Sequence, residues 1–254
     1  MTDAASVAGA APRRLPIGLV LGGLLLAALI LGGVWYAQAA ARDSAEAEAR
    51  QALTQVADRV LLVANGPHVE VVNMLQPIDA TLFQHIGKLY RLSTCKLSDC
   101  DVTDDQLAQL TGLSSLLVLQ VERCPKVTSQ GMVHVAELSS LEKLFADGTS
   151  IDDAGLAHLA GLRTLTTLDV SHTKITDAGL AHLTDLPKLE VLRISGAEVT
   201  DAGVEHLKAI EPLRLLNVSG TKITPAGKQA LQAVNRELKF EETETPQVTE
   251  PQPE

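Results

Sequence analysis

Apolar residues recur at a fixed interval through the second half of the chain. Each unit carries the phrase Asp-Ala-Gly, then leucines at three-residue spacing, then a Leu-x-Val or Leu-x-Ile run and a polar turn. Three consecutive units of 24 residues share this pattern: IDDAGLAHLAGLRTLTTLDVSHTK, ITDAGLAHLTDLPKLEVLRISGAE and VTDAGVEHLKAIEPLRLLNVSGTK, which begin at Ile151, Ile175 and Val199. Such a period is typical of a solenoid, in which each unit buries its apolar face against its neighbours.

The pattern predicts the structure of one unit. The Leu-x-Val run is long enough only for a short strand, and strands of successive units stack in parallel about 4.8 Å apart. Thr176 and Thr200 are suited to be helix N-caps, and Asp177 and Asp201 follow in the first turn, facing the positive end of their own helix. We expect an α/β solenoid with a curved parallel sheet on its concave face and short helices on its convex face.

These units resemble leucine-rich repeat proteins, in particular the bacterial type whose units carry ITDAGL. The resemblance extends over about residues 69–240, because weaker copies flank the three clear ones. A first strand is expected at 68–75, and residues 224–238 repeat only the helical half and should close the far end. The resemblance implies the solenoid fold, but this fold hosts many unrelated functions.

The N-terminal part has a different pattern. Residues 15–41 carry no charge and are long enough, at about 1.5 Å per residue, to cross a hydrocarbon layer of about 30 Å. Arginines precede the segment and Trp35 and Tyr36 lie near its end, which predicts a single-pass signal anchor in the cell membrane, with residues 1–14 cytoplasmic and the repeats extracytoplasmic. The alternative is a signal peptide cleaved near Ala37-Gln38-Ala39. Gly18 and Gly22 have the GxxxG spacing that lets two membrane helices pack as a homodimer.

Three further boundaries follow. Residues 43–66 are expected to form one helix that caps the open first end of the solenoid, or alternatively a self-associating helix. Residues 67–240 form the leucine-rich repeat domain. Residues 241–254 are acidic and rich in proline, and we expect them to be disordered.

Residues between the buried strand positions should point to solvent on the concave face. The central row is Lys96, Gln120, Phe145, Asp169, Arg193 and Asn217; one flanking row is Thr94, Val118, Lys143, Thr167, Val191 and Leu215; the other is Ser98, Glu122, Asp147, Ser171, Ser195 and Ser219. Because these positions vary while the core positions repeat, we expect a surface that recognises a protein partner. Its candidate contacts are Lys96, Gln120, Phe145, Asp169, Arg193, Asn217, Lys143, Glu122 and Asp147.

Phe145 and Arg193 are the expected main contacts, because aromatic and arginine side chains dominate many interfaces. In the alternative interpretation, Phe145 only covers neighbouring side chains and Arg193 pairs with Asp169 on the adjacent strand. Truncating Phe145 should then leave partner binding unchanged.

Other chemistry is weakly represented in the sequence. The net charge of −10 and the absence of clustered Lys and Arg argue against nucleic acid. Histidines 134, 158, 182 and 206 recur with the unit, as any repeated residue must, so we expect no metal. No nucleophile elbow, phosphate loop or HExxH is present, so we expect no catalytic residue, no cofactor and no enzymatic activity.

Cys100 and Cys124 occupy equivalent positions in neighbouring units, close enough for a disulfide in an oxidising compartment. The alternative is that both are buried thiols that fill space at the bend after the strand. Cys95 replaces a core leucine and should be a buried, inert thiol.

Together these observations predict a membrane-anchored, non-enzymatic protein-binding module. One alternative is a self-associating scaffold or spacer of the cell envelope. Another is an intracellular adaptor, suggested by resemblance to the substrate-recognition half of F-box leucine-rich repeat proteins. The membrane segment conflicts with that second alternative.

Overall fold

The computed structural model describes residues 17–56, 60–65, 68–74 and 80–241. The chain divides into two compact units, Met1–Ser44 and Ala45–Glu254, and helix α1 (Ile17–Thr54) runs through the boundary between them. Among the described residues, no helix has both the length and the apolar character needed to cross a membrane. Of the transmembrane segment expected over 15–41, residues 15–16 lie outside the described residues, and residues 17–33 are described without their side chains.

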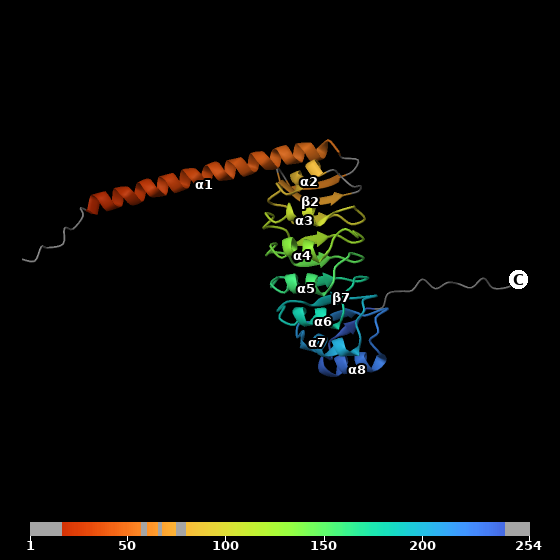
Figure 1. The fold of residues 1–254 in the computed structure, drawn as a ribbon. Coiled ribbons are helices and arrows are strands. Elements are labelled where there is room, and N and C mark those ends of the chain that lie inside the picture. Colours follow the sequence, from red (N-terminus) through yellow and green to blue (C-terminus); the bar gives the residue numbers. More distant parts are fainter. Residues whose placement is uncertain (1–16, 57–59, 66–67, 75–79, 242–254) are drawn as a thin grey trace, which may run out of the picture. The chain divides into compact units, whose positions relative to one another are not determined.

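The second unit is built on one nine-stranded sheet whose strands follow each other in chain order (Figure 1). β1 (Val60–Asn65) and β2 (His68–Met74) are antiparallel, and all later neighbours are parallel. The other strands are β3 (Thr94–Lys96), β4 (Val118–Gln120), β5 (Lys143–Phe145), β6 (Thr167–Asp169), β7 (Val191–Arg193), β8 (Leu215–Asn217) and β9 (Lys239–Phe240).

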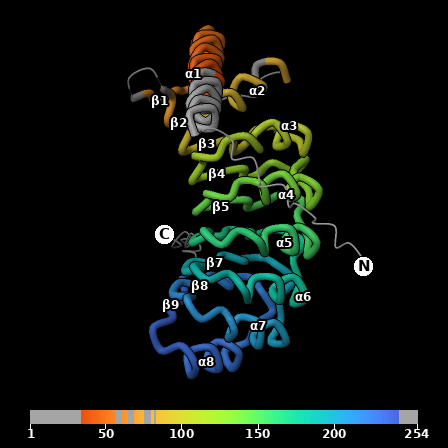
Figure 2. The backbone as a smooth tube through the Cα atoms, turned by 90° about the vertical axis from the view of Figure 1, so that its left-hand side faces the viewer, coloured from red at the N-terminus to blue at the C-terminus, as the bar shows by residue number. Residues whose placement is uncertain are grey.

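Short helices form a second layer on one side of the sheet (Figure 2). They are α2 (Ala80–Ile86), α3 (Asp104–Ala108), α4 (Ser129–Val135), α5 (Asp153–Leu159), α6 (Asp177–Leu180), α7 (Val204–Ala209) and α8 (Pro225–Val234), with 3-10 turns η1 (Ala181–Leu183) and η2 (Asp201–Gly203). The core lies between the two layers, and Leu162, Leu165 and Leu168 of one unit are at most 1% exposed. The stack of short parallel strands backed by helices confirms the predicted repeat architecture.

The helix expected over residues 43–66 ends at Thr54, so this prediction was wrong in its second half. Residues 60–65 instead form β1, which makes an antiparallel pair with β2. Asn65 is the last residue of β1 and pairs with His68, the first residue of β2. Ala49 and Leu53 of α1 remain buried, and a carboxylate oxygen of Glu46 accepts a bond from the backbone N–H of Val69 at 3.1 Å.

The aspartates of the repeated phrase bind the next unit. Oδ1 of Asp177 accepts a hydrogen bond from the backbone N–H of Thr200 at 2.8 Å, and Oδ2 accepts one from its hydroxyl at 2.7 Å. The same pair of bonds recurs at Asp104–Thr128, Asp153–Thr176 and Asp201–Thr224. Thr200 is an N-cap as predicted. Asp177 lies in the first turn of α6 as predicted, and its two bonds to Thr200 also join successive repeats, a contact that the sequence did not predict.

The glycine of the phrase makes room for this bond. A Cβ at Gly203 would lie 2.5 Å from Oδ1 of Asp177, closer than real Cβ contacts. At one interface the two residue types are exchanged: Ser129 stands in the aspartate position and Asp152 in the threonine position, and the serine hydroxyl donates to Asp152 at 2.5 Å. Asp-Ala-Gly is therefore a device for joining successive units.

Candidate functional site

The central and first flanking rows predicted from the sequence lie on the side of the sheet away from the helices, which we call the sheet face. Neighbouring members of both rows are partners in the sheet register, from Thr94↔Val118 and Lys96↔Gln120 through to the last strands. The third row follows the strands and is joined in part by bonds between units, such as Ser98 Oγ to Glu122 Oε2 at 3.1 Å. The candidate contacts of the three rows are therefore neighbours.

Exposure separates these candidates. Lys143 is exposed, whereas Lys96, Gln120, Phe145, Asp169, Arg193, Glu122 and Asp147 are half-buried. Asn217 is only 3% exposed, and Ser171 and Ser195 are also buried. The side chain of Asn217 accepts a bond from the backbone N–H of Ser219 at 3.0 Å. Its predicted exposure to solvent is therefore wrong, while its contact with a partner stays a prediction.

The alternative interpretation paired Arg193 with Asp169, but the partner of Arg193 in the structure is Glu241. Its guanidinium holds both carboxylate oxygens of Glu241, with Nε to Oε2 at 2.5 Å and Nη2 to Oε1 at 3.1 Å. This bidentate bond raises the pKa of Arg193 and lowers the pKa of Glu241. Glu241 lies 24 residues after Asn217, so the repeat period alone could have added it to the central row.

A polar pocket of about 300 Å³ opens on the sheet face beside this ion pair. Burial raises the pKa of Asp169, although the backbone N–H of Ser171 donates to its carboxylate at 3.0 Å. Carboxylates, one guanidinium and an imidazole thus converge here. The lining residues are Asp147, Asp169, Ser171, His172, Arg193, Ser195, Asn217 and Glu241.

His172 also lines this pocket. Its Nδ1 lies 2.7 Å from Oδ1 of Asp147, and its φ is 51°, in the left-handed region. The two serines nearby are engaged elsewhere: Ser195 donates to the carbonyl of Ser219 at 2.9 Å, and Ser171 Oγ accepts from the backbone of Ser195 at 3.2 Å. The described bonds therefore place no serine hydroxyl on the imidazole, and the geometry suits binding of polar groups.

The three cysteines are free, buried thiols, so Cys100 and Cys124 are not joined in this structure. Burial raises the pKa of Cys95 to about 12 and that of Cys100 to about 11. The thiol of Cys124 donates to the carbonyl of Leu97 at 3.2 Å. Across the described ranges, no group of three His, Cys, Asp or Glu side chains is arranged to hold a metal ion.

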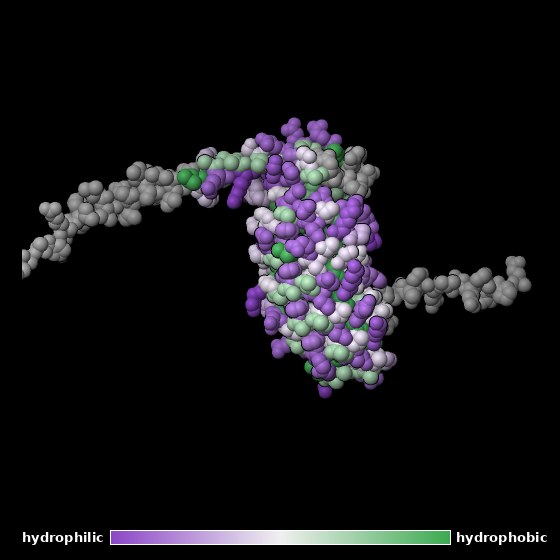
Figure 3. Space-filling model, in the orientation of Figure 1, coloured by the Kyte–Doolittle hydropathy of each residue, from purple (hydrophilic) through white to green (hydrophobic). Residues whose placement is uncertain are grey.

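The sheet face continues onto the N-terminal hairpin, whose first strand was wrongly expected to be helical. Leu61 lies opposite Asn73, which in turn neighbours Lys96 of the central row. Val63 lies opposite Val71, the neighbour of Thr94. Leu61 and Val63 are 52% and 49% exposed. By comparison, the side of the molecule seen in Figure 3 is mostly hydrophilic, with only scattered apolar residues. The hairpin thus adds an apolar end to the sheet face.

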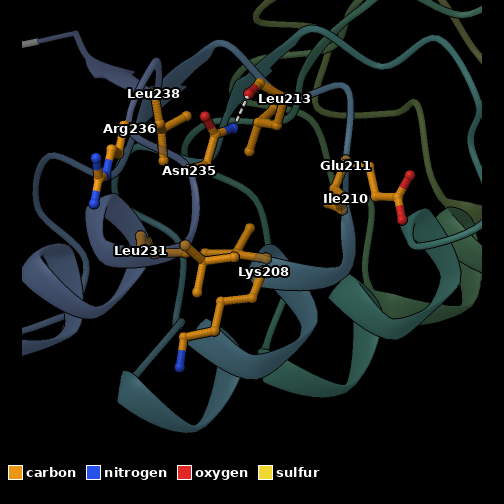
Figure 4. A pocket seen from close by; sticks show the side chains of 10 residues that line it. Lys208, Ile210, Glu211, Leu213, Leu231, Asn235, Arg236 and Leu238 are labelled. Carbon is orange, nitrogen blue, oxygen red and sulfur yellow. Dashed lines mark hydrogen bonds between the residues drawn. The ribbon is translucent and has the colours of Figure 1, made fainter.

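A second pocket, of about 470 Å³, lies where the repeats end (Figure 4). Ile210 and Leu213 are buried, but their period counterparts Val234 and Glu237 are exposed. Asn235 crosses the gap and donates to the carbonyl of Leu213 at 2.6 Å. The pocket therefore results from a final unit that lacks two of its core residues.

The comparisons with known proteins agree with this architecture. A family profile described as Leucine Rich repeat matches residues 161–183 and 185–208. The crystal structure of internalin C2 from Listeria monocytogenes is similar, with a TM-score of 0.54 and 23% identity over 68% of this chain and 70% of that one. A leucine-rich repeat protein of Leptospira interrogans gives a TM-score of 0.48 and 17% identity over 68% of this chain and 48% of that one. No curated protein sequence matches. The matched repeats, the 24-residue period and the stacked parallel strands together show that the chain contains leucine-rich repeats and has the leucine-rich repeat fold.

Proposed function

We propose that this chain is a membrane-anchored, non-enzymatic module that binds a protein partner through its sheet face. The observation that supports this most is the contrast between two sets of positions on the same strands. The strand leucines at 119, 144, 168, 192 and 216 are all 0% exposed. The accessible positions beside them carry Gln120, Phe145, Asp169 and Arg193, which differ in size and charge. Varied side chains on a constant scaffold are suited to specific recognition.

The chemistry of the face suggests how a partner is held. Phe145 is half-buried and lies between Gln120 and Asp169 in the central row, with exposed Lys143 on the same strand. An apolar side chain of the partner that packs against Phe145 would bury apolar surface, which favours binding. The carboxylates of Asp147 and Asp169 would attract a cationic side chain, and such charge matching contributes mainly to specificity and association rate.

The direct test substitutes this surface in the full chain. The double variant Phe145→Ala with Lys143→Glu should reduce retention of envelope proteins by at least about tenfold, because truncating a hot-spot residue costs about 2 kcal/mol or more and a tenfold change in affinity corresponds to about 1.4 kcal/mol. His182→Glu is the matched control, because His182 lies on the helix side, away from the sheet face. Quantitative mass spectrometry should show one set of proteins retained by the native chain and the control but lost from the double variant. Identical sets from all three proteins would contradict the proposal.

We further propose that residues 15–41 anchor the chain in the cell membrane, with residues 1–14 cytoplasmic and the repeats extracytoplasmic. The supporting feature is the uncharged length of this segment and the arginines that precede it. A reporter fused after Glu254 should be active only outside the cytoplasm and should remain with the membrane fraction. A cytoplasmic reporter would invert the topology, and a reporter released from the membrane would favour cleavage near residue 39.

A further inference from the structure

The two edges of the sheet are protected very differently. β9 has two residues, one of them the exposed Lys239, and short or charged edge strands resist pairing with other chains. β1 has six residues, Val-Leu-Leu-Val-Ala-Asn, with neither charge nor proline. Its one irregularity is a register shift between Val63 and Ala64, near its end. β1 is therefore long, uncharged and open to another strand.

β1 offers two kinds of groups to another strand: backbone N–H and C=O groups, and exposed apolar side chains. Within the described sheet β1 is the first strand (Figure 2) and pairs on one side only, with β2. An edge strand leaves the N–H and C=O groups of its outer side without a strand partner. Leu61 and Val63 alternate with Leu62 along the strand and are about half exposed on the sheet face. An added strand would satisfy the backbone groups and cover both side chains.

We propose that β1 pairs in antiparallel fashion with β1 of a second copy of this chain, about a two-fold axis at Leu62. In this register Leu61 lies opposite Val63 of the second copy, and Val63 opposite its Leu61. A two-fold interface uses the same patch on both copies and must be self-complementary. β1 meets this condition, because apolar residues face each other at both sites and no like charges meet. The pairing is independent of the partner contacts near Phe145 and of the Gly18 and Gly22 spacing.

A mixed-cysteine experiment on the full chain in detergent tests the register. Leu61→Cys and Val63→Cys proteins are prepared separately, mixed, and treated with a mild oxidant, and covalent dimer is measured on a non-reducing gel. We expect several times more dimer in the mixture than in either protein alone, because position 61 faces position 63 across the axis. The native thiols at 95, 100 and 124 are buried and give a low background. Equal yields in all three samples would overturn the proposed pairing.

Light scattering supplies an independent measurement. The native protein should show a dimer mass that falls on dilution, and Leu61→Lys with Val63→Lys should remain monomeric. Leu117→Lys is the matched control, since it removes a 37% exposed leucine from another strand region and should leave the dimer intact. A native monomer at every concentration would overturn the proposal. So would a dimer that survives the two lysines but is lost in Gly18→Leu, because the contact would then lie in the apolar segment.

Discussion

At the residue scale, the turns that follow the strands each place one residue in the left-handed backbone region. Glycine occupies this position at 148, 196 and 220, but Asp99, Arg123 and His172 occupy it with φ of 59°, 55° and 51°. A side chain there costs about 1–2 kcal/mol. These side chains also bond to the neighbouring unit: Arg123 holds Asp99 through two bonds of 2.5 Å, and His172 bonds to Asp147. Backbone strain and contact between units thus occur at the same positions.

Gly196 and Gly220 allow the cost of a left-handed backbone to be distinguished from the cost of a steric clash. We expect Gly196→Ala to destabilise the fold more than Gly220→Ala, although both have nearly the same φ, 69° and 70°. A Cβ at 196 would lie 2.6 Å from Cδ2 of His172, whereas one at 220 meets no atom closer than 3.4 Å. Chemical denaturation should show a loss of about 1–2 kcal/mol for Gly220→Ala and a larger one for Gly196→Ala. His172→Ala should remove the excess; equal losses in the two alanine variants would contradict this reasoning.

Asp169 gives a prediction about pH. Burial raises its folded-state pKa, so its ionised form lowers stability, and that penalty disappears as the pH falls through the raised pKa. Asp169→Asn should therefore raise the free energy of unfolding at pH 7, by less than about 1 kcal/mol because solvent screens a half-exposed group, and the melting temperature should rise with it. The advantage should fade near pH 4. Asn217 already accepts the equivalent bond from Ser219 at 3.0 Å, so the amide fits this geometry. A lower melting temperature at pH 7 would show that attraction to Arg193 outweighs burial.

At the element scale, the Asp–Thr bonds couple each unit to the next. Asp177→Ala removes two acceptors from Thr200 and leaves its backbone N–H without that partner. We expect a loss of about 1–3 kcal/mol in the free energy of unfolding, the usual cost of removing one partner from a hydrogen bond. Asp185→Ala, an exposed carboxylate in the same unit, should change stability by less than about 0.5 kcal/mol.

A double variant identifies the source of that loss. If Asp177 acts through Thr200, then adding Thr200→Val to Asp177→Ala should cost less than the sum of the two single losses. Strictly additive losses would mean that the two side chains do not interact.

Among the elements, the strands and their register could be predicted from the sequence, whereas the contacts between units could not. The strand positions follow from the local period, so the register of Lys96, Phe145 and Arg193 could be assigned from the repeated residues alone. Contacts that join units could not, because a repeated residue gives no sign of which unit it contacts. Asp177 could be predicted in the first turn of its own helix, where it lies, but its bonds to Thr200 of the next unit could not. β1 is hard to predict because Val60 and Val63 also fit the spacing of one helix face, and an Asn-Gly pair after them is as typical of a helix end as of a turn.

At the scale of the whole repeat domain, the sheet face changes character from one end to the other. Its first strands present Leu61 and Val63, whereas its last strands hold Asp169, Arg193 and Glu241 around the polar pocket. Phe145 lies between these two regions. A partner that binds the sheet face between Phe145 and β7 would therefore meet an aromatic contact at one end and charged groups at the other, while the apolar end at β1 contacts the second copy of the chain.

Site-specific photo-crosslinking in intact cells tests the proposed function most directly. A photoreactive residue replaces Phe145 on the sheet face in one full-length protein, and His182 on the helix side in another. We predict a discrete adduct with a different protein from position 145 and none from position 182. Adducts from both positions alike, from 182 alone, or from neither would contradict recognition through the sheet face.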